Sequence, residues 1–375
     1  MSTPTGTARS VMLAAGGTGG HLFPAFALAQ ELGRRGIVVD LVTDMRGDRY
    51  GMNFPARKTY QVPSATPAGR SIVGTGRAAL LLSRGVAAAH RLFGEVKPSA
   101  VIGFGGYPSF PPLVAARLRG IPTGLHEQNA VLGRANRALA RYMTAIATSF
   151  EDTKFVGENL RSKVKLTGNP VRDAVVDWAT QSYHAPDARG PLSLVVFGGS
   201  QGARFFSDTV PPTFALLPEP VRARLFVVQQ CREEDLARVE SAYQAIGVRA
   251  HLAAFFSNLP EEMAKAHLVI GRSGASTVAE LTVLGRPAVL VPLPHAIDND
   301  QLQNARRLEA AGGAWCLEQR DVTPESLAKT IAGLLTSPEA LAKAAAAAKA
   351  LGRSDAVLRL ADVVEGLISL KARSA

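Results

Sequence analysis

The chain has 375 residues, of which 47% are hydrophobic and 19% are charged, the composition of a folded globular protein. This length is large for one hydrophobic core and suits two domains. No apolar run approaches the ~18 residues that a membrane-spanning helix needs. The two cysteines, Cys231 and Cys316, form neither a metal-ligand pattern nor a disulfide framework. The first ten residues lead straight into a strand without a secretory apolar region, so we expect a cytoplasmic protein.

The net charge of +11 calls for an anionic partner or another explanation. Aromatic residues make up only 6% of the chain and are not interleaved with the basic residues, so we expect no nucleic-acid partner. An anionic membrane surface or a phosphorylated substrate fits the charge as well.

The chain opens with an apolar strand at Val11–Ala15, a glycine turn at Gly16–Gly20 and a helical run over Ala25–Leu32. Glycines let the backbone come close to a ligand, and a helix N-terminus facing the turn favours a phosphate or another anion. His21 ends the turn with a side-chain type that titrates near neutral pH.

Three other interpretations of this turn compete with a substrate site. A plain strand-to-helix connection needs no ligand at all. A dinucleotide fingerprint would begin at Gly17 and Gly19, but Leu22 occupies its third glycine position, although Asp40 stands where a ribose-binding acid would. A P-loop is excluded because no Gly-Lys-Ser/Thr follows.

Strands and helices alternate through the rest of the first half. We expect strands at Ile37–Thr43, Ala100–Gly103, Thr123–Glu127 and Ala145–Ser149, and helices at Pro111–Arg119 and Gly133–Tyr142. This alternation predicts a parallel sheet covered by helices on both faces. Ligands of such sheets bind beyond the carboxyl ends of the strands, where polar clusters fall at residues 103–107 and 126–129.

One stretch of the first half carries arginines spaced by seven residues: Arg70, Arg77, Arg84 and Arg91. On a helix they would line one stripe beside the apolar residues of 72–93. A basic stripe flanking an apolar face suits a helix in a membrane interface, whereas an ordinary core-facing helix with solvated arginines explains the same pattern. Gly74, Gly76 and Gly85 weaken the prediction of one continuous helix.

The strand–glycine turn–helix pattern restarts at Leu192–Phe197, Gly198–Gly202 and Ala203–Leu217, after a poorly patterned stretch at 181–191. Further strands are expected at Arg224–Gln229, Arg249–Ala253, Leu268–Gly271 and Ala288–Val291, and the tail Ala340–Leu370 is helical. We therefore expect an α/β fold of two Rossmann-like domains with parallel sheets facing across a cleft, with a boundary between about 165 and 192.

Two polar segments of the second half suit a nucleotide sugar. Residues 271–280 follow a strand and open a helix, so backbone N–H groups and Arg272 could bind a diphosphate, and Glu280 two ribose hydroxyls. A surface charge and a solvated helix face are the alternatives for these two residues. Asp300 and Gln301 could pair with vicinal sugar hydroxyls. A metal site at Asp298 and Asp300 is discounted, because hard metals usually require more oxygen ligands.

Seven segments, in order over nearly the whole chain, resemble the MurG family, the peptidoglycan N-acetylglucosaminyltransferases of the GT-B fold. They are GGTGGHLFP (Gly16–Pro24), GFGGYPS (Gly103–Ser109), HEQNAVLGRAN (His126–Asn136), GNPVR (Gly168–Arg172), GGSQGAR (Gly198–Arg204), RSGASTVAE (Arg272–Glu280) and DNDQLQNA (Asp298–Ala305). The resemblance implies an inverting transfer of N-acetylglucosamine from UDP-GlcNAc to the muramoyl C4 hydroxyl of lipid I, undecaprenyl-diphosphoryl-MurNAc-pentapeptide. The product would be lipid II, and neither a cofactor nor a metal is implied.

The resemblance also implies an organisation in two parts. Residues 1–170 would form an acceptor- and membrane-binding domain, and 171–375 a UDP-sugar-binding domain whose last helix is a candidate to pack back on the first. Because the acceptor is anchored in the membrane, the protein would lie peripherally on the cytoplasmic face of the bacterial inner membrane, attached through residues 70–93. A cell-wall synthesis complex is a candidate partner.

Residue roles follow by position in the matching motifs. In the first domain, Thr18, Gly19, Gly20 and Asn129 would face the acceptor and the transferring sugar, and Arg172 would close the cleft.

In the second domain, Phe256 would give backbone contacts to uracil and Glu280 would hold the ribose. The remaining donor-binding residues would be Ser200, Arg272 and Ala275 for the diphosphate, with Gln301 and Asp300 for the sugar. Inversion needs a base for the acceptor hydroxyl, and His21 is the candidate, with orientation of the acceptor as its alternative role.

The chain departs from the family pattern at residues 42–48, to which no function is transferred, and at Pro108 and Phe110, which could reshape acceptor contacts. Rival functions are a UDP-GlcNAc 2-epimerase of the same fold, an NAD-dependent oxidoreductase, and a non-catalytic membrane-bound scaffold.

Overall fold

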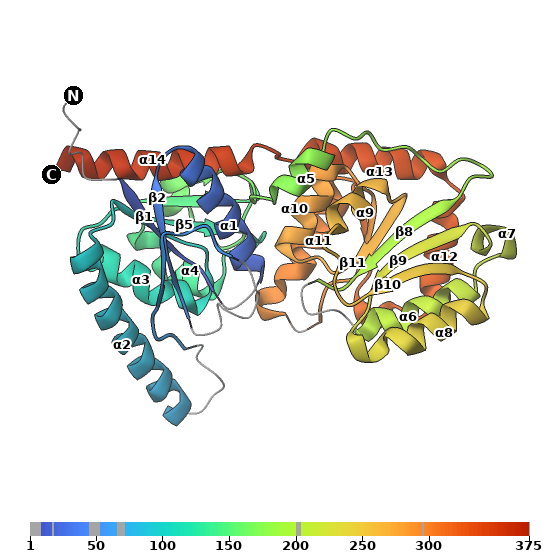
Figure 1. The fold of residues 1–375 in the computed structure, drawn as a ribbon, viewed down its shortest axis with the longest axis horizontal. Helices are drawn as coiled ribbons and strands as arrows, with labels where there is room; N and C mark the ends of the chain where they lie inside the picture. The colour runs from blue at the N-terminus through green and yellow to red at the C-terminus, as the bar shows by residue number, and fades with distance from the viewer. Residues whose placement is uncertain are drawn as a thin grey trace. The chain divides into compact units, whose positions relative to one another are not determined.

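The computed structural model describes residues 9–16, 19–44, 53–65, 72–199, 204–294 and 296–374. The chain divides into two compact units: unit 1 comprises Met1–Arg172 and Asp355–Ala375, and unit 2 comprises Asp173–Ser354. Each unit is a parallel sheet with helices packed on it (Figure 1). Within the described ranges, no helix is long and apolar enough to cross a membrane.

The sheet of unit 1 has seven parallel strands in the order β3-β2-β1-β4-β5-β6-β7. The strands are β1 (Ser10–Ala14), β2 (Val38–Thr43), β3 (Lys58–Gln61), β4 (Ala100–Gly103), β5 (Thr123–Glu127), β6 (Ala145–Thr148) and β7 (Val164–Leu166). The five strands expected from apolar runs are confirmed to within one residue at either end. The two edge strands, β3 and β7, escaped prediction because an edge strand is short and half-solvated and needs no apolar run.

Helices cover both faces of this sheet, and the alternation of side chains along β1 shows why. Val11 and Leu13 belong to a core shared with α1 (Gly19–Arg34) and α14 (Ala356–Ser374). Met12 points to the opposite face and joins a core with α2 (Ile72–Val96) and α3 (Gly106–Leu118). A strand buried on both faces is expected to be a nearly continuous apolar run, and β1 is apolar from Val11 to Ala14, with Ser10 as its one polar residue.

The basic stretch forms one continuous helix, α2, although four glycines lie within it. Gly85 is the one with a clear packing reason. A Cβ at this position would lie 2.1 Å from the carbonyl oxygen of Pro63 and 3.0 Å from Pro111. Only a glycine lets α2 approach the start of α3 and the loop after β3 this closely. Arg77, Arg84 and Arg91 are exposed, whereas Arg70 lies outside the described residues.

Two helices begin earlier than their sequences predict, and both changes affect the candidate site. α1 begins at Gly19, so His21 lies in its first turn instead of before the helix, and Pro24 lies within it. As the sixth residue of α1, Pro24 lies past the first four N–H groups that lack intrahelical partners, so it removes one backbone hydrogen bond from the helix. α3 begins at Gly106, so part of the expected polar loop after β4 is helical.

The sheet of unit 2 has six parallel strands in the order β10-β9-β8-β11-β12-β13. The strands are β8 (Leu192–Phe197), β9 (Leu225–Gln230), β10 (Arg249–Ala253), β11 (Leu268–Gly271), β12 (Ala288–Leu290) and β13 (Ala314–Cys316). The helices that matter below are α10 (Ala275–Leu284), α11 (Asp300–Ala310) and α13 (Pro338–Leu351). The expected α/β fold with parallel sheets is confirmed, and β13 was missed because three residues carry too little pattern.

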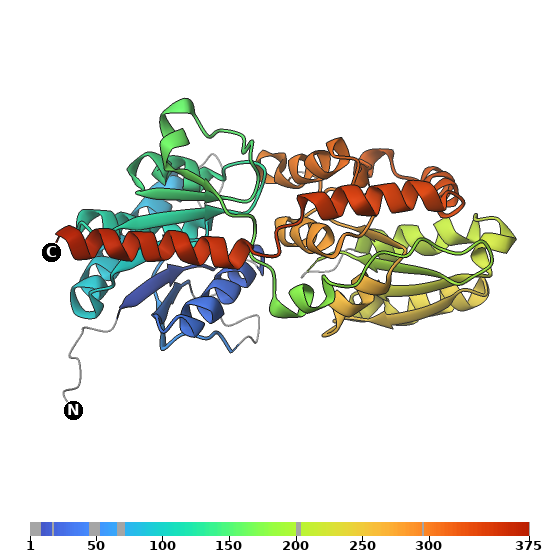
Figure 2. The ribbon, with the colours of Figure 1, turned by 90° about the horizontal axis from the view of Figure 1, so that it is seen from above.

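The predicted helical tail is two helices, α13 in unit 2 and α14 in unit 1. α14 runs along unit 1 in both views of the ribbon (Figures 1 and 2). Its apolar residues Leu360, Val364 and Leu367 are buried in the same core as α1. The end of the chain therefore completes the hydrophobic core that its beginning starts.

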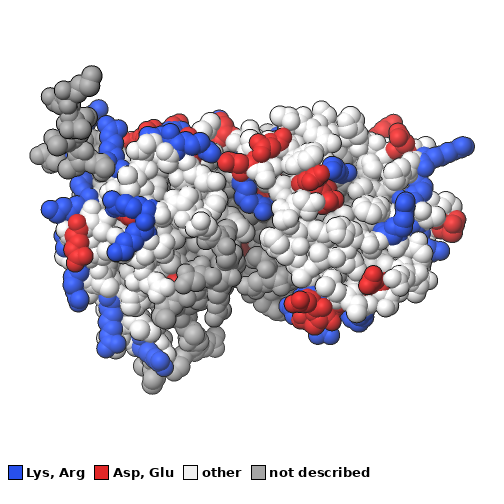
Figure 3. Space-filling view, in the orientation of Figure 1, with Lys and Arg blue, Asp and Glu red and all other residues white. Residues whose placement is uncertain are grey.

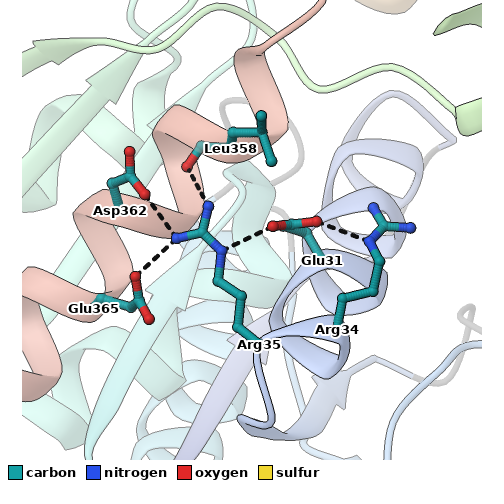
Figure 4. Close-up of polar contacts among 6 residues, drawn as sticks. All are labelled: Glu31, Arg34, Arg35, Leu358, Asp362 and Glu365. Atoms are coloured by element: carbon teal, nitrogen blue, oxygen red, sulfur yellow. Dashed lines mark hydrogen bonds and ion pairs between the residues drawn. The ribbon is translucent and has the colours of Figure 1, made fainter.

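A charged cluster at the end of α1 ties that helix to α14 (Figure 4). Arg35 donates from Nη1 to Asp362 at 2.7 Å and to Glu365 at 2.8 Å, and from Nη2 to the carbonyl of Leu358. Its Nε donates to Glu31 at 2.8 Å, which also accepts from Arg34. Burial raises the pKa of Glu31, but the hydrogen bonds from both arginines outweigh this effect and lower it overall.

Replacing Arg35 should loosen α14 more than replacing its neighbour. Arg35→Met removes four hydrogen bonds, three of them to carboxylates, whereas Arg34→Met removes the bond to Glu31 from a half-exposed side chain. We expect the amides of α14 to exchange roughly 10-fold faster in Arg35→Met, equivalent to about 1.4 kcal/mol, with little change in Arg34→Met. Hydrogen–deuterium exchange measures both.

The same cluster predicts the direction of a pH effect. Because the folded pKa of Glu31 is lowered from 4.5, its contribution to stability is complete above that value and disappears as the pH falls through the folded pKa. Arg35→Met should flatten this part of the acid unfolding curve. Equal steepness in both proteins would contradict the assignment of the cluster as a clamp.

Candidate functional site

The first part of the site lies at the carboxyl ends of β1, β4 and β5 in unit 1. Gly105 and Gly106 follow β4 with φ of +88° and +68°, a conformation that favours glycine. A Cβ on Gly105 would lie 3.4 Å from Cε1 of His21, and one on Gly106 would lie 3.3 Å from its Nε2. The imidazole of His21 therefore packs directly against this glycine turn.

Side chains from the end of β5 hold the other side of the ring. Nδ1 of His21 lies 3.1 Å from Oε1 of Gln128. The Gln128 amide also contacts His126, whose Nε2 lies 3.0 Å from the carbonyl oxygen of Gly168. Gln128 and His126 are almost fully buried, while His21 is half-buried. A chain of polar contacts thus runs from the protein interior to His21.

The carboxylate of Glu127 organises the loop that follows β5. It is 2% exposed and accepts from the backbone N–H groups of Asn129 (3.0 Å) and Gly133 (2.9 Å). The side-chain amides of Asn129 and Asn136 donate to it as well. Burial raises the pKa of Glu127, and these hydrogen bonds oppose the rise. Because both of its oxygens accept hydrogen bonds from these groups, Glu127 is a structural group and is poorly placed to accept a proton from a substrate.

The other predicted residues of unit 1 lie around this arrangement. Gly19 and Gly20 precede His21 in the first turn of α1. The side chain of Asn129 is half-buried and bound to Glu127. Arg172 places its guanidinium 5.6 Å from the ring centre of Phe23, also on α1. Thr18 lies outside the described residues, as does Ser200 of unit 2.

The second part of the site follows β11 in unit 2, where Gly274 caps the N-terminus of α10 and Ala275 begins it. Ser273 donates from Oγ to the carbonyl of Gln301 at 2.8 Å, and its own carbonyl accepts from Asn304. The turn after β11 and the start of α11 are therefore fixed to one another. This brings Arg272, Ala275, Asp300 and Gln301 into one region.

Arg272 is held inside the protein, with 6% of its surface exposed. It donates to the carbonyls of Val291 and Pro292 and to Oε1 of Gln319, and its guanidinium lies 5.2 Å from the ring centre of Phe206. Burial lowers its pKa to about 10, so the side chain is still cationic at neutral pH. Its terminal nitrogens are used by the protein, so it provides a fixed positive charge beneath the loop after β12.

That loop also has an unusual backbone before α11. Asp298 and Asn299 both have positive φ, +58° and +53°, which side-chain-bearing residues adopt infrequently and Asp and Asn most readily. After this turn, Asp300 accepts from the backbone N–H of Gln301 at 2.7 Å, and Oε1 of Gln301 accepts from Leu293 at 3.0 Å. The predicted sugar-binding residues are thus fixed by a strained turn.

Two donor-site predictions fall on residues with buried side chains. Phe256 follows β10, is 6% exposed and packs edge-to-face on His251, so that only its backbone is suited to a ligand. Its neighbour Phe255 is 75% exposed. Glu280 lies in α10 and is 7% exposed.

Sequence reasoning missed two residues of the site in unit 1. Gln128 received no role, although it contacts His21 directly. Asn169 is 5% exposed, and neither polar atom of its amide has a hydrogen-bond partner. A buried amide without partners costs about 1–3 kcal/mol, which is a signal for a ligand or a water. Gln128 and Asn169 belong to the motifs HEQNAVLGRAN and GNPVR. Their position just after a strand was the signal that could have assigned them to a ligand site.

The structure argues against the interpretation of the first glycine turn as a dinucleotide site, which needed Asp40 to bind a ribose. Asp40 is completely buried in β2 and is bound through both oxygens by Arg57, so it is not accessible to a nucleotide. Among the residues that the structure describes, no group of three or more His, Cys, Asp or Glu side chains is arranged to hold a metal ion.

Comparison with known protein families matches both halves of the chain. Residues 11–148 match the glycosyltransferase family 28 N-terminal domain, and residues 193–360 match the C-terminal domain of the same family. A relative from Methylobacterium nodulans is 54% identical over 356 residues, covering 94% of this chain and 95% of the relative. It is named UDP-N-acetylglucosamine–N-acetylmuramyl-(pentapeptide) pyrophosphoryl-undecaprenol N-acetylglucosamine transferase.

Solved structures agree with this match. The crystal structure of MurG from Acinetobacter baumannii has a TM-score of 0.78 and 29% identity, covering 96% of this chain and 99% of that one. A UDP-GlcNAc 2-epimerase from Neisseria meningitidis has a TM-score of 0.65 over 95% of this chain and all of its own, at 15% identity. The likeness to the epimerase concerns the fold alone.

Glu127→Gln should release the loop after β5. In this variant an NH₂ group replaces one carboxylate oxygen and faces N–H groups that need an acceptor. The loop therefore loses at least one hydrogen bond to a charged group, worth about 1.5–3 kcal/mol. We expect the backbone amides of Asn129 and Gly133 to exchange roughly 10- to 100-fold faster. Glu151→Gln, at an exposed glutamate, is the control. Unchanged protection of both amides would show that Glu127 does not organise the loop.

Proposed function

Since this chain belongs to glycosyltransferase family 28, and within it to the MurG transferases, we propose that it moves N-acetylglucosamine from UDP-GlcNAc to lipid I. The muramoyl C4 hydroxyl would attack the anomeric carbon, with inversion, to give lipid II. The proposal draws on the activity named for a relative that is 54% identical over nearly the full length. The structural observation that carries it is the half-buried His21, held by Gln128 beside the carboxyl ends of the central strands.

The proposed reaction needs a base for the acceptor hydroxyl. His21 suits this role because a neutral imidazole accepts a proton, and Gln128 together with the Gly105–Gly106 turn fixes the ring. Gly19, Gly20 and Asn129 would line the acceptor site around it. Glu127 would act only by shaping the loop that carries Asn129.

The donor would bind unit 2 at the N-terminus of α10. Backbone N–H groups from Gly274 and Ala275 would face the diphosphate, and the buried charge of Arg272 would favour it from behind. Stabilising the departing UDP in this way lowers the barrier for displacement.

Further contacts would complete donor recognition. Glu280 would accept from the ribose hydroxyls, and Asp300 and Gln301 would bind the sugar, with Ser200 near the diphosphate. Backbone groups of Phe256 would pair with uracil, and the exposed ring of Phe255 offers it an apolar surface.

We also propose that unit 1 attaches to an anionic membrane surface through α2. Lys and Arg side chains follow the region of α2 in the space-filling view (Figure 3). Arg77, Arg84 and Arg91 are exposed, and Leu80 between them is 53% exposed. Basic side chains beside exposed apolar ones are what an interfacial helix requires. The site of attachment would be the cytoplasmic leaflet of the bacterial inner membrane, where a cell-wall synthesis complex is a candidate partner.

A transfer assay separates the proposed reaction from its rival. With UDP-GlcNAc and a lipid I analogue, the protein should form a labelled disaccharide product, and it should do so in EDTA. With UDP-GlcNAc alone it should form no UDP-ManNAc, the product that an epimerase would make. Epimerisation without transfer would overturn the proposal, and loss of transfer in EDTA with recovery by a divalent metal would restore the metal site at Asp298 and Asp300.

His21→Ala should lower kcat by ~10²–10⁴-fold, because the acceptor hydroxyl loses its base. The KM for UDP-GlcNAc should change little, because the donor-binding residues belong to unit 2. In the unaltered protein kcat should fall at acidic pH, where the ring is protonated and cannot accept a proton. A raised KM for lipid I with kcat preserved would instead make His21 an acceptor-orienting residue.

Replacing Arg77, Arg84 and Arg91 by Gln should weaken binding to anionic vesicles on the order of 100-fold, from about 1 kcal/mol for each basic residue. Activity on a short-chain soluble acceptor should survive. The matched control replaces three exposed basic residues of unit 2, Arg249, Lys329 and Lys343, with the same change in net charge. Equal weakening in both triple variants would mean that α2 has no special role.

A further inference from the structure

The amide of Gln128 has one possible orientation. Its Nε2 lies 3.0 Å from the carbonyl oxygen of Phe104 and 3.1 Å from that of His126. Carbonyl oxygens only accept hydrogen bonds, so a flipped amide would place its own oxygen against both of them. The NH₂ group therefore faces these carbonyls, and Oε1 faces His21.

His126 supports the same orientation. Its Nε2 lies 3.0 Å from the carbonyl oxygen of Gly168 and must carry a proton to donate to it. Burial lowers the pKa of His126 to about 4, so the ring is neutral near pH 7 and its Nδ1 holds a lone pair. That lone pair lies 3.0 Å from Nε2 of Gln128 and is a third acceptor for its two hydrogens, so one of them is shared between two acceptors.

The orientation of the amide then determines the tautomer of His21. Oε1 of Gln128 can only accept, and it lies 3.1 Å from Nδ1 of His21, so Nδ1 carries the proton. In the neutral ring the lone pair is on Nε2. Gly106 lies at this edge of the ring, and a side chain there would begin 3.3 Å from Nε2.

We propose that Gln128 is a positioning residue that holds neutral His21 in the Nδ1–H tautomer, so that Nε2 is the atom that accepts the proton of the acceptor hydroxyl. As this proton moves to Nε2, the hydroxyl oxygen bonds to the anomeric carbon, and the bond from that carbon to UDP breaks with its electron pair leaving on UDP. The catalytic part rests on the proposed function, whereas the tautomer is a property of the protein without substrates.

The tautomer can be measured on the full chain labelled with ¹⁵N-histidine. Long-range ¹H–¹⁵N correlation at alkaline pH, where the rings are neutral, shows which nitrogen of each ring carries the proton. The signals of His21 are those missing from His21→Ala. The expected result is a protonated Nδ1 and an unprotonated Nε2. A proton on Nε2 of His21 in the unaltered protein overturns the proposal, whatever the activity.

Two variants of Gln128 test the link to catalysis. Gln128→Met keeps the length but removes the acceptor, so the ring should lose its single tautomer and kcat should fall roughly 10- to 100-fold, with the KM for UDP-GlcNAc little changed. Gln128→Glu in its protonated form is the matched control, because one carboxyl oxygen still faces Nδ1 while the protonated oxygen donates to the carbonyl of Phe104 or His126 as the amide did. It should keep the Nδ1–H tautomer and recover most of kcat. Two results would overturn the positioning role of Gln128. One is a full kcat in Gln128→Met. The other is an equal loss of kcat in both variants while His21 keeps its Nδ1–H tautomer.

The two proposals fail in different ways. If His21→Ala keeps its kcat, His21 is not the base and the catalytic role of Gln128 fails with it, although the measured tautomer stands. If His21→Ala loses kcat while the unaltered ring carries its proton on Nε2, the base assignment stands and only the role of Gln128 is wrong.

Discussion

A carboxylate buried at the end of β5 must find hydrogen-bond donors within the protein, and the region around His21 is built on this requirement. Glu127 is 2% exposed, and its donors come from the loop that follows it and from Asn136 in the helix after that loop. The loop therefore folds back on the strand end. Gln128, between the carboxylate and the loop, is turned toward His21 with an amide that has no freedom to flip. The buried carboxylate of Glu127 thus fixes the loop that begins next to Gln128.

The same requirement operates in unit 2 with the opposite charge. Arg272 is buried, and its terminal nitrogens donate to carbonyl oxygens of the segment after β12 and to Gln319, while its Nε has no hydrogen-bond partner. A guanidinium in that position fixes the loop before α11, whose turn at Asp298 and Asn299 then needs left-handed backbone. Its charge remains, so the N-terminus of α10 lies in a region favourable to anions. The proposed binding of the diphosphate and the structure of the loop would therefore depend on the same buried guanidinium.

Parallel sheets explain why both arrangements occur where they do. In each unit the central strand, β1 or β8, has neighbours that continue the sheet in opposite directions along the chain, which is where such folds bind ligands. Apolar side chains fill most of both faces of the strands, so the polar clusters described above lie at or beyond the carboxyl ends. The proposed division of labour, with acceptor chemistry in unit 1 and nucleotide binding in unit 2, follows from which polar groups each strand end carries.

The sequence alone determined the parts of this protein that depend on local pattern. Apolar runs such as 11–15 and 192–197 specify buried parallel strands, and seven ordered motifs specify the family. His21 was identified because its residue type and glycine surroundings are visible in the chain. Tertiary structure alone decided what depends on distant partners: the early start of α1, the burial of Arg272 against carbonyls, and the contact between Gln128 and His21 across 107 positions. Hydrogen-bond partners that are brought together by folding produce no repeating pattern in the sequence. Each partner is a single residue at the end of a strand, so nothing around it in the chain marks its role.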